Sequence, residues 1–506
     1  MAKNQKNYIE SVAFVSLGCP KNLVDSERML GLLAQDGLSI TPHAADADAI
    51  VINTCGFLEA SKEESLREIR QAIELKKDGK VKRVVVAGCL VQRHKTKLLD
   101  DVPEIDRLVG VFDRENIVAA VRGVENPRQQ HGHYLGKYHD LSRELERGLN
   151  VVGGGLEDSP THNLQPTTYN KQNRLPVFED DRARLRLTPR HYAYLRMSEG
   201  CNQGCAFCTI PGIRGPMRSK PVEQILAEAR ELAADGAVEL NLIGQDTTSY
   251  GTDIGYADGL SGLLRALDKQ LPRDVRWVRL MYAYPSCFTD EMIKTIADCD
   301  RVVKYIDMPL QHINDRLLHL MKRRVTGNEI RTLLNKLREW VPGISIRTTF
   351  IAGSPTETDA EHAELVDFVR DFGFDMMGVF PYSAEPGTPM GRMSEQVSDD
   401  VKKMRVEELM LTQQEVAFAR NERLVGQSLE VLIDKIHAGV GTTAPTFSAR
   451  HAGQAPDIDS VVFVKAKGVH AGEFVNVKVT DFQAYDLVAE RIMPKSRKLA
   501  VLSAAK

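Results

Sequence analysis

The 506-residue chain lacks any apolar run long enough to cross a bilayer, and it has almost no net charge. Its first seven residues are polar and contain lysine, and no apolar core of signal-peptide length follows them. These two absences predict a cytoplasmic protein. The 66 Lys and Arg residues against 69 Asp and Glu give a net charge of -3, which argues against a protein that coats nucleic acid by electrostatics alone.

Cysteine is also scarce, with 8 residues in the whole chain. In a reducing compartment disulfides are rare, and clustered thiols more often bind metal or take part in chemistry. Six of the eight cysteines fall into two patterned groups. Cys287 and Cys299 have no thiol partner at ligand spacing, and we expect them to be buried or idle. The length and the 42% hydrophobic content suit two to four packed domains.

The first group of cysteines lies in a short loop rich in glycine. Cys201, Cys205 and Cys208 are separated by three residues and then by two, so that one loop can wrap one iron–sulfur cube. A [4Fe–4S] cube ordinarily takes four cysteines, and three leave one iron open for the amino and carboxylate groups of S-adenosylmethionine. The alternatives are a zinc knuckle or redox thiols. A zinc finger would need a second cysteine pair or histidines at ligand spacing, and none lies nearby.

This loop resembles the signature of the radical S-adenosylmethionine superfamily. The cysteine spacing agrees, and the aromatic residue before the last cysteine is Phe207. The resemblance implies a [4Fe–4S] cluster on the three thiolates, S-adenosylmethionine as a second cofactor, and Phe207 as a residue of the cofactor site.

The second group of cysteines comes from three repeats of one pattern near the start of the chain. β-rich apolar runs end at Cys19, Cys55 and Cys89, and helical spacing follows the first two. The predicted strands are residues 12–17, 49–53, 83–87 and 107–112, and the predicted helices are 26–36 and 61–77. Such alternation predicts a doubly wound parallel sheet, which binds ligands at the carboxyl ends of its strands. Strands about 4.8 Å apart let the three cysteines converge on one cluster, and the alternative is three separate buried cysteines.

Together the two cysteine groups resemble the radical methylthiotransferases. Residues 16–27, Ser-Leu-Gly-Cys-Pro-Lys-Asn-Leu-Val-Asp-Ser-Glu, are similar to the branch that modifies ribosomal protein S-twelve. The branch that modifies tRNA adenosines usually has a different residue pair after this cysteine. The resemblance implies an auxiliary [4Fe–4S] cluster on Cys19, Cys55 and Cys89, from which sulfur is delivered.

The implied reaction is methylthiolation of an aspartate β-carbon. It consumes two S-adenosylmethionine molecules, one for the methyl group and one for the radical, and an electron donor such as a flavodoxin or ferredoxin. Two rival hypotheses stay open. One is the same chemistry on a tRNA adenosine, and the other is a non-catalytic iron–sulfur or zinc protein that binds ribosomes through its tail.

The centre of the chain predicts a partial barrel. Six strand candidates alternate with helical segments: residues 192–197, 238–243, 276–282, 302–308, 345–351 and 376–380. Six units fit an open (β/α)6 barrel of TIM type, with its chemistry at the carboxyl-terminal loops. Those loops carry Gln245, which we expect at the cofactor site, and His312, which we expect to be a hydrogen-bonded rim residue. Residues 353–358 resemble a family loop that usually reads Gly-Phe-Pro-Gly-Glu-Thr, with departures at Ser354 and Thr356.

The whole chain is therefore expected to be a multidomain α/β protein in four segments. Residues 1–123 form the N-terminal α/β domain, 124–189 a polar insert or linker, 190–423 the radical core, and 424–495 a small β-barrel. In the insert, His131 and His133 are expected to be solvated loop residues rather than metal ligands.

The last segment has the short β runs 428–433, 461–465 and 474–479, which predict a small barrel of the oligonucleotide-binding type. It resembles the TRAM domain of methylthiotransferases. RNA contact is open here, but acids and bases are nearly balanced, and a protein partner is at least as plausible.

Overall fold

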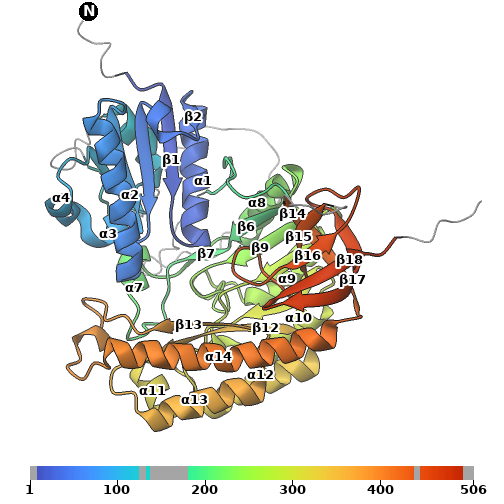
Figure 1. The fold of residues 1–506 in the computed structure, drawn as a ribbon. Coiled ribbons are helices and arrows are strands. Elements are labelled where there is room, and N and C mark those ends of the chain that lie inside the picture. Colours follow the sequence, from blue (N-terminus) through green and yellow to red (C-terminus); the bar gives the residue numbers. More distant parts are fainter. Residues whose placement is uncertain (1–7, 125–132, 137–179, 438–444, 494–506) are drawn as a thin grey trace, which may run out of the picture.

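The structure is a computed structural model that describes residues 8–124, 133–136, 180–437 and 445–493. It contains a parallel sheet covered by helices, a six-stranded partial barrel and a closed β-barrel, as Figure 1 shows. The multidomain α/β architecture predicted from the sequence is confirmed. Within these described ranges, no helix is both long and apolar enough to span a membrane.

The N-terminal sheet has five parallel strands in the order β2-β1-β3-β4-β5. They are β1 (Ser11–Ser16), β2 (Ser39–Thr41), β3 (Ala49–Thr54), β4 (Arg83–Gly88) and β5 (Arg107–Val109). Alternate residues of the strands face opposite sides of the sheet, and each side packs into its own hydrophobic cluster. One cluster lies under α1 (Pro20–Gln35) and α5 (Ile117–Arg122), and the other lies under α2 (Glu59–Lys77) and α3 (Cys89–His94). This two-sided burial explains why β3 is apolar almost throughout, and it makes the sheet doubly wound.

A described piece of the polar insert packs against this sheet. Tyr134 forms a parallel bridge with Val109 at the end of β5. Beside it, the buried His133 accepts a hydrogen bond at Nδ1 from the backbone amide of Leu108, at 3.3 Å. The expectation of a solvated histidine is therefore wrong for His133, because the chain returns to cover the edge strand. His131 lies outside the described residues.

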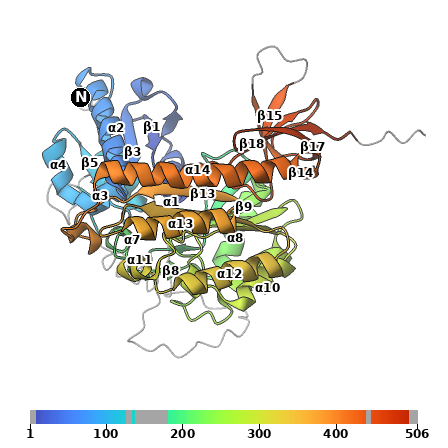
Figure 2. The ribbon, with the colours of Figure 1, turned by 60° about the horizontal axis from the view of Figure 1, so that its bottom comes forward.

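The central sheet has six parallel strands in the order β13-β12-β11-β10-β9-β6, and the predicted partial barrel is confirmed. They are β6 (Tyr192–Arg196), β9 (Glu239–Ile243), β10 (Trp277–Leu280), β11 (Val302–Asp307), β12 (Ser345–Ala352) and β13 (Met376–Pro381). Outside it lie α8 (Val222–Ala234), α9 (Gly259–Gln270), α10 (Asp290–Asp298), α11 (Asp315–Leu320), α12 (Gly327–Trp340) and α13 (Asp359–Phe372). In Figure 2 the long α14 (Asp399–Leu424) crosses beside β13 toward the C-terminal barrel.

The C-terminal strands close into a barrel in the order β14-β15-β16-β18-β17. They are β14 (Ser428–His437), β15 (Thr446–His451), β16 (Val462–Lys465), β17 (Phe474–Gln483) and β18 (Asp486–Arg491). The sequence predicted three of them and missed β15 and β18.

One loop of this barrel covers the inner side of the partial barrel. Asp459 accepts a hydrogen bond from the Tyr305 hydroxyl at 2.9 Å, and Asp457 accepts from Tyr192 and Tyr194, each at 3.1 Å. Arg450 of β15 donates to Glu239 of β9 at 2.7 Å. The barrel interior is therefore closed on this side by the C-terminal domain, which leaves the carboxyl ends of the strands as the face for chemistry.

Candidate active site

The loop with Cys201, Cys205 and Cys208 follows the two-residue strand β7 (Ser198–Glu199), at the carboxyl end of β6. Only glycine fits position 200, because its φ is +79° and an added Cβ would lie 2.1 Å from the backbone oxygen of Pro216. The backbone amide of Cys201 donates to Gly215 at 3.2 Å, which ties the start of the loop to the end of α7 (Ile210–Arg214). The loop is thus held at a fixed position on the barrel rim.

Donors surround the sulfur atoms of this loop. The backbone amide of Gln203 lies 3.5 Å from Cys201 Sγ, and that of Ile210 lies 3.4 Å from Cys208 Sγ. Arg323 Nη1 lies 3.7 Å from Cys205 Sγ. Burial, the largest cause, raises the pKa of the Cys201 thiol to about 11 and that of Cys208 to about 12, and the neighbouring thiols add to both shifts. Hydrogen bonds to sulfur are typical of cysteines that hold iron–sulfur clusters, so these residues fit such a group.

The other predicted residues of this region lie around the loop. Phe207 packs on an apolar floor that includes Met321 and Tyr382. Gln245 donates its amide N–H to Glu199, and its buried Oε1 has no hydrogen-bond partner among the described residues. Burial lowers the pKa of His312 to about 3, and its Nδ1 accepts from the backbone amide of Asn314 at 3.0 Å. His312 is therefore a neutral, buried residue of the rim, and the cofactor roles of Phe207 and Gln245 stay predictions.

The second group of cysteines lies at the carboxyl edge of the N-terminal sheet. Cys19 is the N-cap of α1, Cys55 follows β3, and Cys89 begins α3. An added Cβ on Gly18 would lie 3.3 Å from Cys55 Sγ, so the loop before α1 passes directly over the end of β3. Burial, the largest cause, raises the pKa of Cys89 to about 12; Arg214 acts to lower it, and the nearby charges of Cys19 and Cys55 contribute to the rise. Cys19 and Cys55 thus act electrostatically on Cys89 at this edge of the sheet.

The helix α7, which follows the first cysteine loop, reaches the second cysteine group across the boundary between the sheet and the barrel. Arg214, at the end of α7, donates to Cys89 Sγ from Nε at 3.3 Å and from Nη2 at 3.1 Å. Cys89 and Ile213 also share a small buried cluster with Val111 and Phe112. The helix that follows the first cysteine loop therefore contacts the second cysteine group directly.

Three family models match successive parts of the chain. Residues 11–110 match the uncharacterized protein family UPF0004, residues 195–369 the radical SAM superfamily, and residues 425–492 the TRAM domain. The chain is 39% identical over 481 residues to the ribosomal protein uS12 methylthiotransferase RimO of Desulforamulus reducens, covering 95% of this chain and 99% of the relative. It is 40% identical to the RimO of Trichlorobacter lovleyi, covering 96% and 98%.

The chain belongs to the RimO family of methylthiotransferases. It is accordingly a radical SAM enzyme, with an iron–sulfur cluster and S-adenosylmethionine as cofactors. Among solved structures, the radical SAM methyltransferase TsrM of Kitasatospora setae is similar over 76% of this chain and 77% of its own, with a TM-score of 0.49 and 15% identity. The assignment rests on the family models and the curated relatives.

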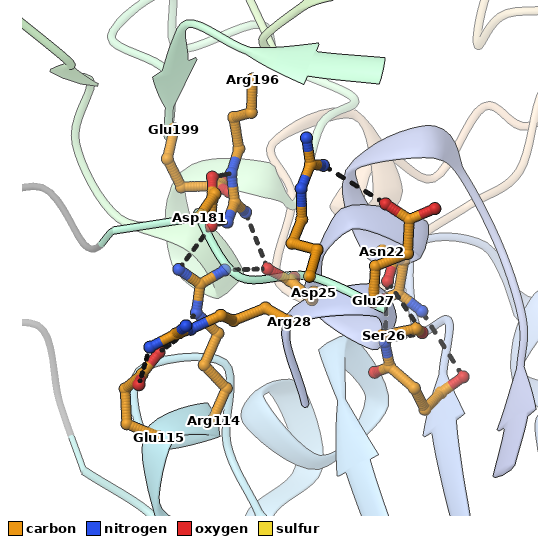
Figure 3. Close-up of polar contacts among 12 residues, drawn as sticks. Asn22, Asp25, Ser26, Glu27, Arg28, Arg114, Glu115, Asp181, Arg196 and Glu199 are labelled. Carbon is orange, nitrogen blue, oxygen red and sulfur yellow. Dashed lines mark hydrogen bonds and ion pairs between the residues drawn. The ribbon is translucent and has the colours of Figure 1, made fainter. Parts of the chain in front are cut away.

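In this RimO-family chain, a buried group of charges joins the sheet to the barrel, and sequence reasoning missed it. We call it the interdomain ion cluster; its members are Asp25, Arg114, Asp181, Arg196, Glu199 and Arg214. Figure 3 shows Asp25 of α1 between the side chains of Arg114 and Arg196. Asp25 accepts from Arg114 and Arg214, each at 2.6 Å, and from Arg196 at 2.7 Å.

The charges of this cluster are fixed by their partners. Burial by itself would raise the pKa of Asp25, but Arg214, Arg196 and Arg114 outweigh it and hold that pKa below its usual value. The carboxylate therefore stays ionised, and the cluster holds α1 and the first cysteine loop in one relative position.

Lys21 is the second feature that sequence reasoning did not single out, although it lies within the 16–27 motif. Its side chain is only 7% exposed, and its Nζ lies 3.2 Å from the centroid of the Tyr282 ring at the carboxyl end of β10. Burial lowers the pKa of this ammonium. Lys21 thus lies at the boundary between the second cysteine group and the barrel rim.

Proposed function

We propose that this enzyme methylthiolates the β-carbon of an aspartate in ribosomal protein uS12, with two [4Fe–4S] clusters and two molecules of S-adenosylmethionine. One observation carries the proposal: Arg214, on the helix that follows the first cysteine loop, donates to Cys89 of the second cysteine group. Sulfur insertion needs a radical generator and a sulfur carrier close together, and this arrangement supports that pairing. The names of the relatives support the substrate.

The two triads have separate roles in this proposal. Cys201, Cys205 and Cys208 would hold the radical cluster, and Cys19, Cys55 and Cys89 would hold the auxiliary cluster. When bound, the first cluster supplies the electron that cleaves S-adenosylmethionine, and the second supplies the sulfur that is delivered.

The residues around the first cysteine loop exclude water from it and hold its neighbours in place. The floor of Phe207, Met321 and Tyr382 shields one side of the first loop from water. Arg323 donates to Cys205, and its guanidinium lies 4.0 Å from the Tyr284 ring centroid, so the cation is fixed against the rim. The interdomain ion cluster keeps the two cysteine groups at a constant separation.

The decisive experiment is mass spectrometry of ribosomal protein uS12 from cells with and without this enzyme. We expect the added mass of a methylthio group on one aspartate only when the enzyme is present. tRNA from the same cells is digested and analysed in parallel. A methylthio group on a tRNA adenosine, with uS12 unmodified in both strains, would contradict the proposal and favour the rival substrate.

A second assay addresses the non-catalytic alternative. The anaerobically reconstituted enzyme, given a flavodoxin or ferredoxin as electron donor, should form 5′-deoxyadenosine and contain iron and sulfide. The C-terminal barrel is the proposed contact to the small ribosomal subunit, through RNA or protein. Iron without any 5′-deoxyadenosine would favour a binding protein.

A further inference from the structure

The segment that follows β13 contacts both cysteine groups. We call residues 382–391 the bridging segment. Near its end, the backbone amide of Met390 donates to the carbonyl of Ala206, inside the first cysteine loop, at 3.1 Å. Tyr382 and Met390 also belong to the apolar floor beneath that loop. Between them lies Glu385, whose side chain is 2% exposed and reaches the N-terminal domain.

The Glu385 carboxylate is fixed at the start of α2. Its Oε2 accepts from Arg93 Nη2 at 2.8 Å, and its Oε1 accepts from the backbone amide of Glu59 at 3.3 Å. Ser383, in the same segment, donates its hydroxyl to Oε1 at 2.6 Å. Glu59 is the first residue of α2, where the free amides and the helix dipole favour a negative charge. A side chain from the partial barrel is therefore held by the N-terminal domain.

Arg93 connects this carboxylate to the loop after β3. Its Nη1 donates to the backbone carbonyls of Gly56 at 2.8 Å and of Phe57 at 3.3 Å, directly after Cys55. One guanidinium can make these contacts together with the ion pair, because its donors lie in a fixed planar fork. The position of Cys55 relative to the first cysteine loop therefore depends on the pair of Arg93 and Glu385.

This link is separate from the one that Arg214 makes. Arg214 reaches the second cysteine group at Cys89, whereas the bridging segment reaches it at Cys55. Contacts at two different cysteines restrain both the separation and the relative rotation of the two groups. A single contact would leave rotation about it free.

We propose that Glu385 is a positioning residue for sulfur transfer. Through Arg93 it holds Cys55 at the distance from the first cysteine loop that the transfer requires. This inference deepens the proposed function and rests on it. Radical formation needs the first loop alone, so loss of Glu385 should impair sulfur transfer and spare radical formation.

The test compares two products of the anaerobically reconstituted, full-length enzyme, supplied with reductant, S-adenosylmethionine and unmodified uS12. In Glu385→Gln, one of the two oxygens that face Arg93 and Glu59 becomes a donor that faces a donor. 5′-Deoxyadenosine should form within about twofold of the parental rate, and methylthiolated uS12 per 5′-deoxyadenosine should fall about tenfold or more, because small misplacements of reacting groups cost this much. A smaller fraction of folded enzyme would lower both products and leave their ratio unchanged.

Hydrogen exchange supplies a readout that does not depend on turnover. The amide of Glu59 donates to Glu385, and the amide of Cys55 donates to the hydroxyl of Ser65 in α2 at 3.2 Å. In Glu385→Gln, peptides that contain these two amides should exchange about tenfold faster or more, because the loop loses its outer restraint.

The matched control is Asp375→Asn at the other end of β13. Asp375 is as deeply buried as Glu385, and it pairs with Arg338 at 2.8 Å and with Arg420 at 2.9 Å. Its replacement also breaks buried ion pairs, but at the amino end of the strand. It should keep the parental product ratio and the parental exchange at Cys55.

A second variant, Arg93→Met, removes the other half of the pair. It should reproduce both effects of Glu385→Gln. The double variant should be no worse than the more severe single variant, because both substitutions act through one contact. If Glu385→Gln does not fold, Arg93→Met takes its place with the same expectations.

Three results would overturn the inference. The first is a parental product ratio in Glu385→Gln, including the case in which both products fall together. The second is an equal fall of the ratio in Asp375→Asn, which would make the effect one of general stability. The third is a lower ratio with parental exchange at Cys55 and Glu59, which would mean that Glu385 does not act through the loop. Failure of the parental enzyme to methylthiolate uS12 would instead overturn the proposed function, and this inference with it.

Discussion

At the scale of single residues, Arg214 links the second cysteine group to the interdomain ion cluster. Its Nε and Nη2 lie on Cys89 Sγ, and its Nη1 donates to Asp25 and Glu199. One guanidinium thus touches the second cysteine group and two acids of the interdomain ion cluster. A lysine would offer a point charge without this planar set of donors.

Replacing Arg214 by glutamine should therefore affect both the stability of the protein and the proposed auxiliary cluster. Removing one partner of a buried ion pair costs about 3 kcal/mol, because the remaining charges lose their compensation. Loss of N–H donors and positive charge near Cys89 should also make the reduction potential of the auxiliary cluster more negative. Urea denaturation and a redox titration followed by electron paramagnetic resonance measure the two effects.

The control for this variant is Arg265→Gln, which breaks an exposed pair with Glu291. It should change stability by about 0.5 kcal/mol or less and leave the potential unchanged. Equal effects of the two substitutions would show that the Arg214 contacts contribute nothing specific.

The ion cluster also predicts how stability depends on pH. Burial alone would raise the pKa of Asp181, but Arg196, Lys220 and Arg114 outweigh it, and the pKa lies well below its usual value. Such a carboxyl contributes stability above its unfolded-state pKa of about 3.9, and that contribution is lost as the pH falls toward the folded-state value. The urea concentration at the midpoint of unfolding should therefore not change through this group above about pH 5. Below about pH 4 it should decrease.

Asp181→Asn should lower the midpoint at pH 7 and flatten the decline below pH 4. Asp78→Asn changes an exposed carboxyl and should reproduce the parental curve. If the urea midpoint of Asp181→Asn falls below pH 4 as steeply as that of the parent, the acid sensitivity does not come from this cluster.

At the scale of elements, most of the strands and both cysteine groups could be predicted from the sequence. Apolar runs that end in a small residue and a cysteine identify β1, β3 and β4, because strand, turn and helix signals are local. The prediction missed β2, β7, β8 (Arg218–Ser219), β15 and β18, and the first three of these strands are only two or three residues long. β15 carries Arg450, which points inward to Glu239, and this polar residue interrupts the alternation that marks a strand.

The loop between β15 and β16 supports a prediction of its own. Asp457 accepts from the hydroxyls of Tyr192 and Tyr194 and has a φ of +68°, which asparagine tolerates and alanine does not. Asp457→Ala should cost about 2–4 kcal/mol, because it adds backbone strain to the loss of two hydrogen bonds. Asp457→Asn should cost about 1 kcal/mol or less.

Hydrogen exchange measures which part of the molecule loses stability in this variant. In Asp457→Ala, amides of β14–β18 should exchange faster than in the parent, because the C-terminal barrel detaches from the partial barrel before it unfolds. Faster exchange spread evenly over all three domains would argue against a local docking role.

At the scale of the whole molecule, the contacts between domains could not be predicted from the sequence. Asp25 and Arg214 are 189 residues apart, and Asp25 and Arg196 are 171 apart. Nothing in local spacing relates such residues, since only the packing of the sheet onto the barrel brings them together. The same holds for Lys21, whose burial depends on Tyr282 of another domain.

The first whole-molecule prediction concerns the radical triad. Alanine at Cys201, Cys205 and Cys208 should abolish cleavage of S-adenosylmethionine and leave the auxiliary cluster in place, because the two triads belong to separate elements. The iron content should fall to about half that of the parent, since one of the two proposed four-iron clusters is lost. Complete loss of iron from this variant would show that the two sites do not assemble independently.

The converse variant separates sulfur transfer from radical generation. With alanine at Cys19, Cys55 and Cys89, the first loop still has its three thiolates, so 5′-deoxyadenosine should form when reductant and S-adenosylmethionine are supplied. Methylthiolation of uS12 should stop. Some loss of stability is expected because metal binding contributes folding free energy, and circular dichroism must therefore confirm intact secondary structure. A folded triple variant that methylthiolates uS12 at the parental rate would return these cysteines to a structural role at the ends of β1, β3 and β4.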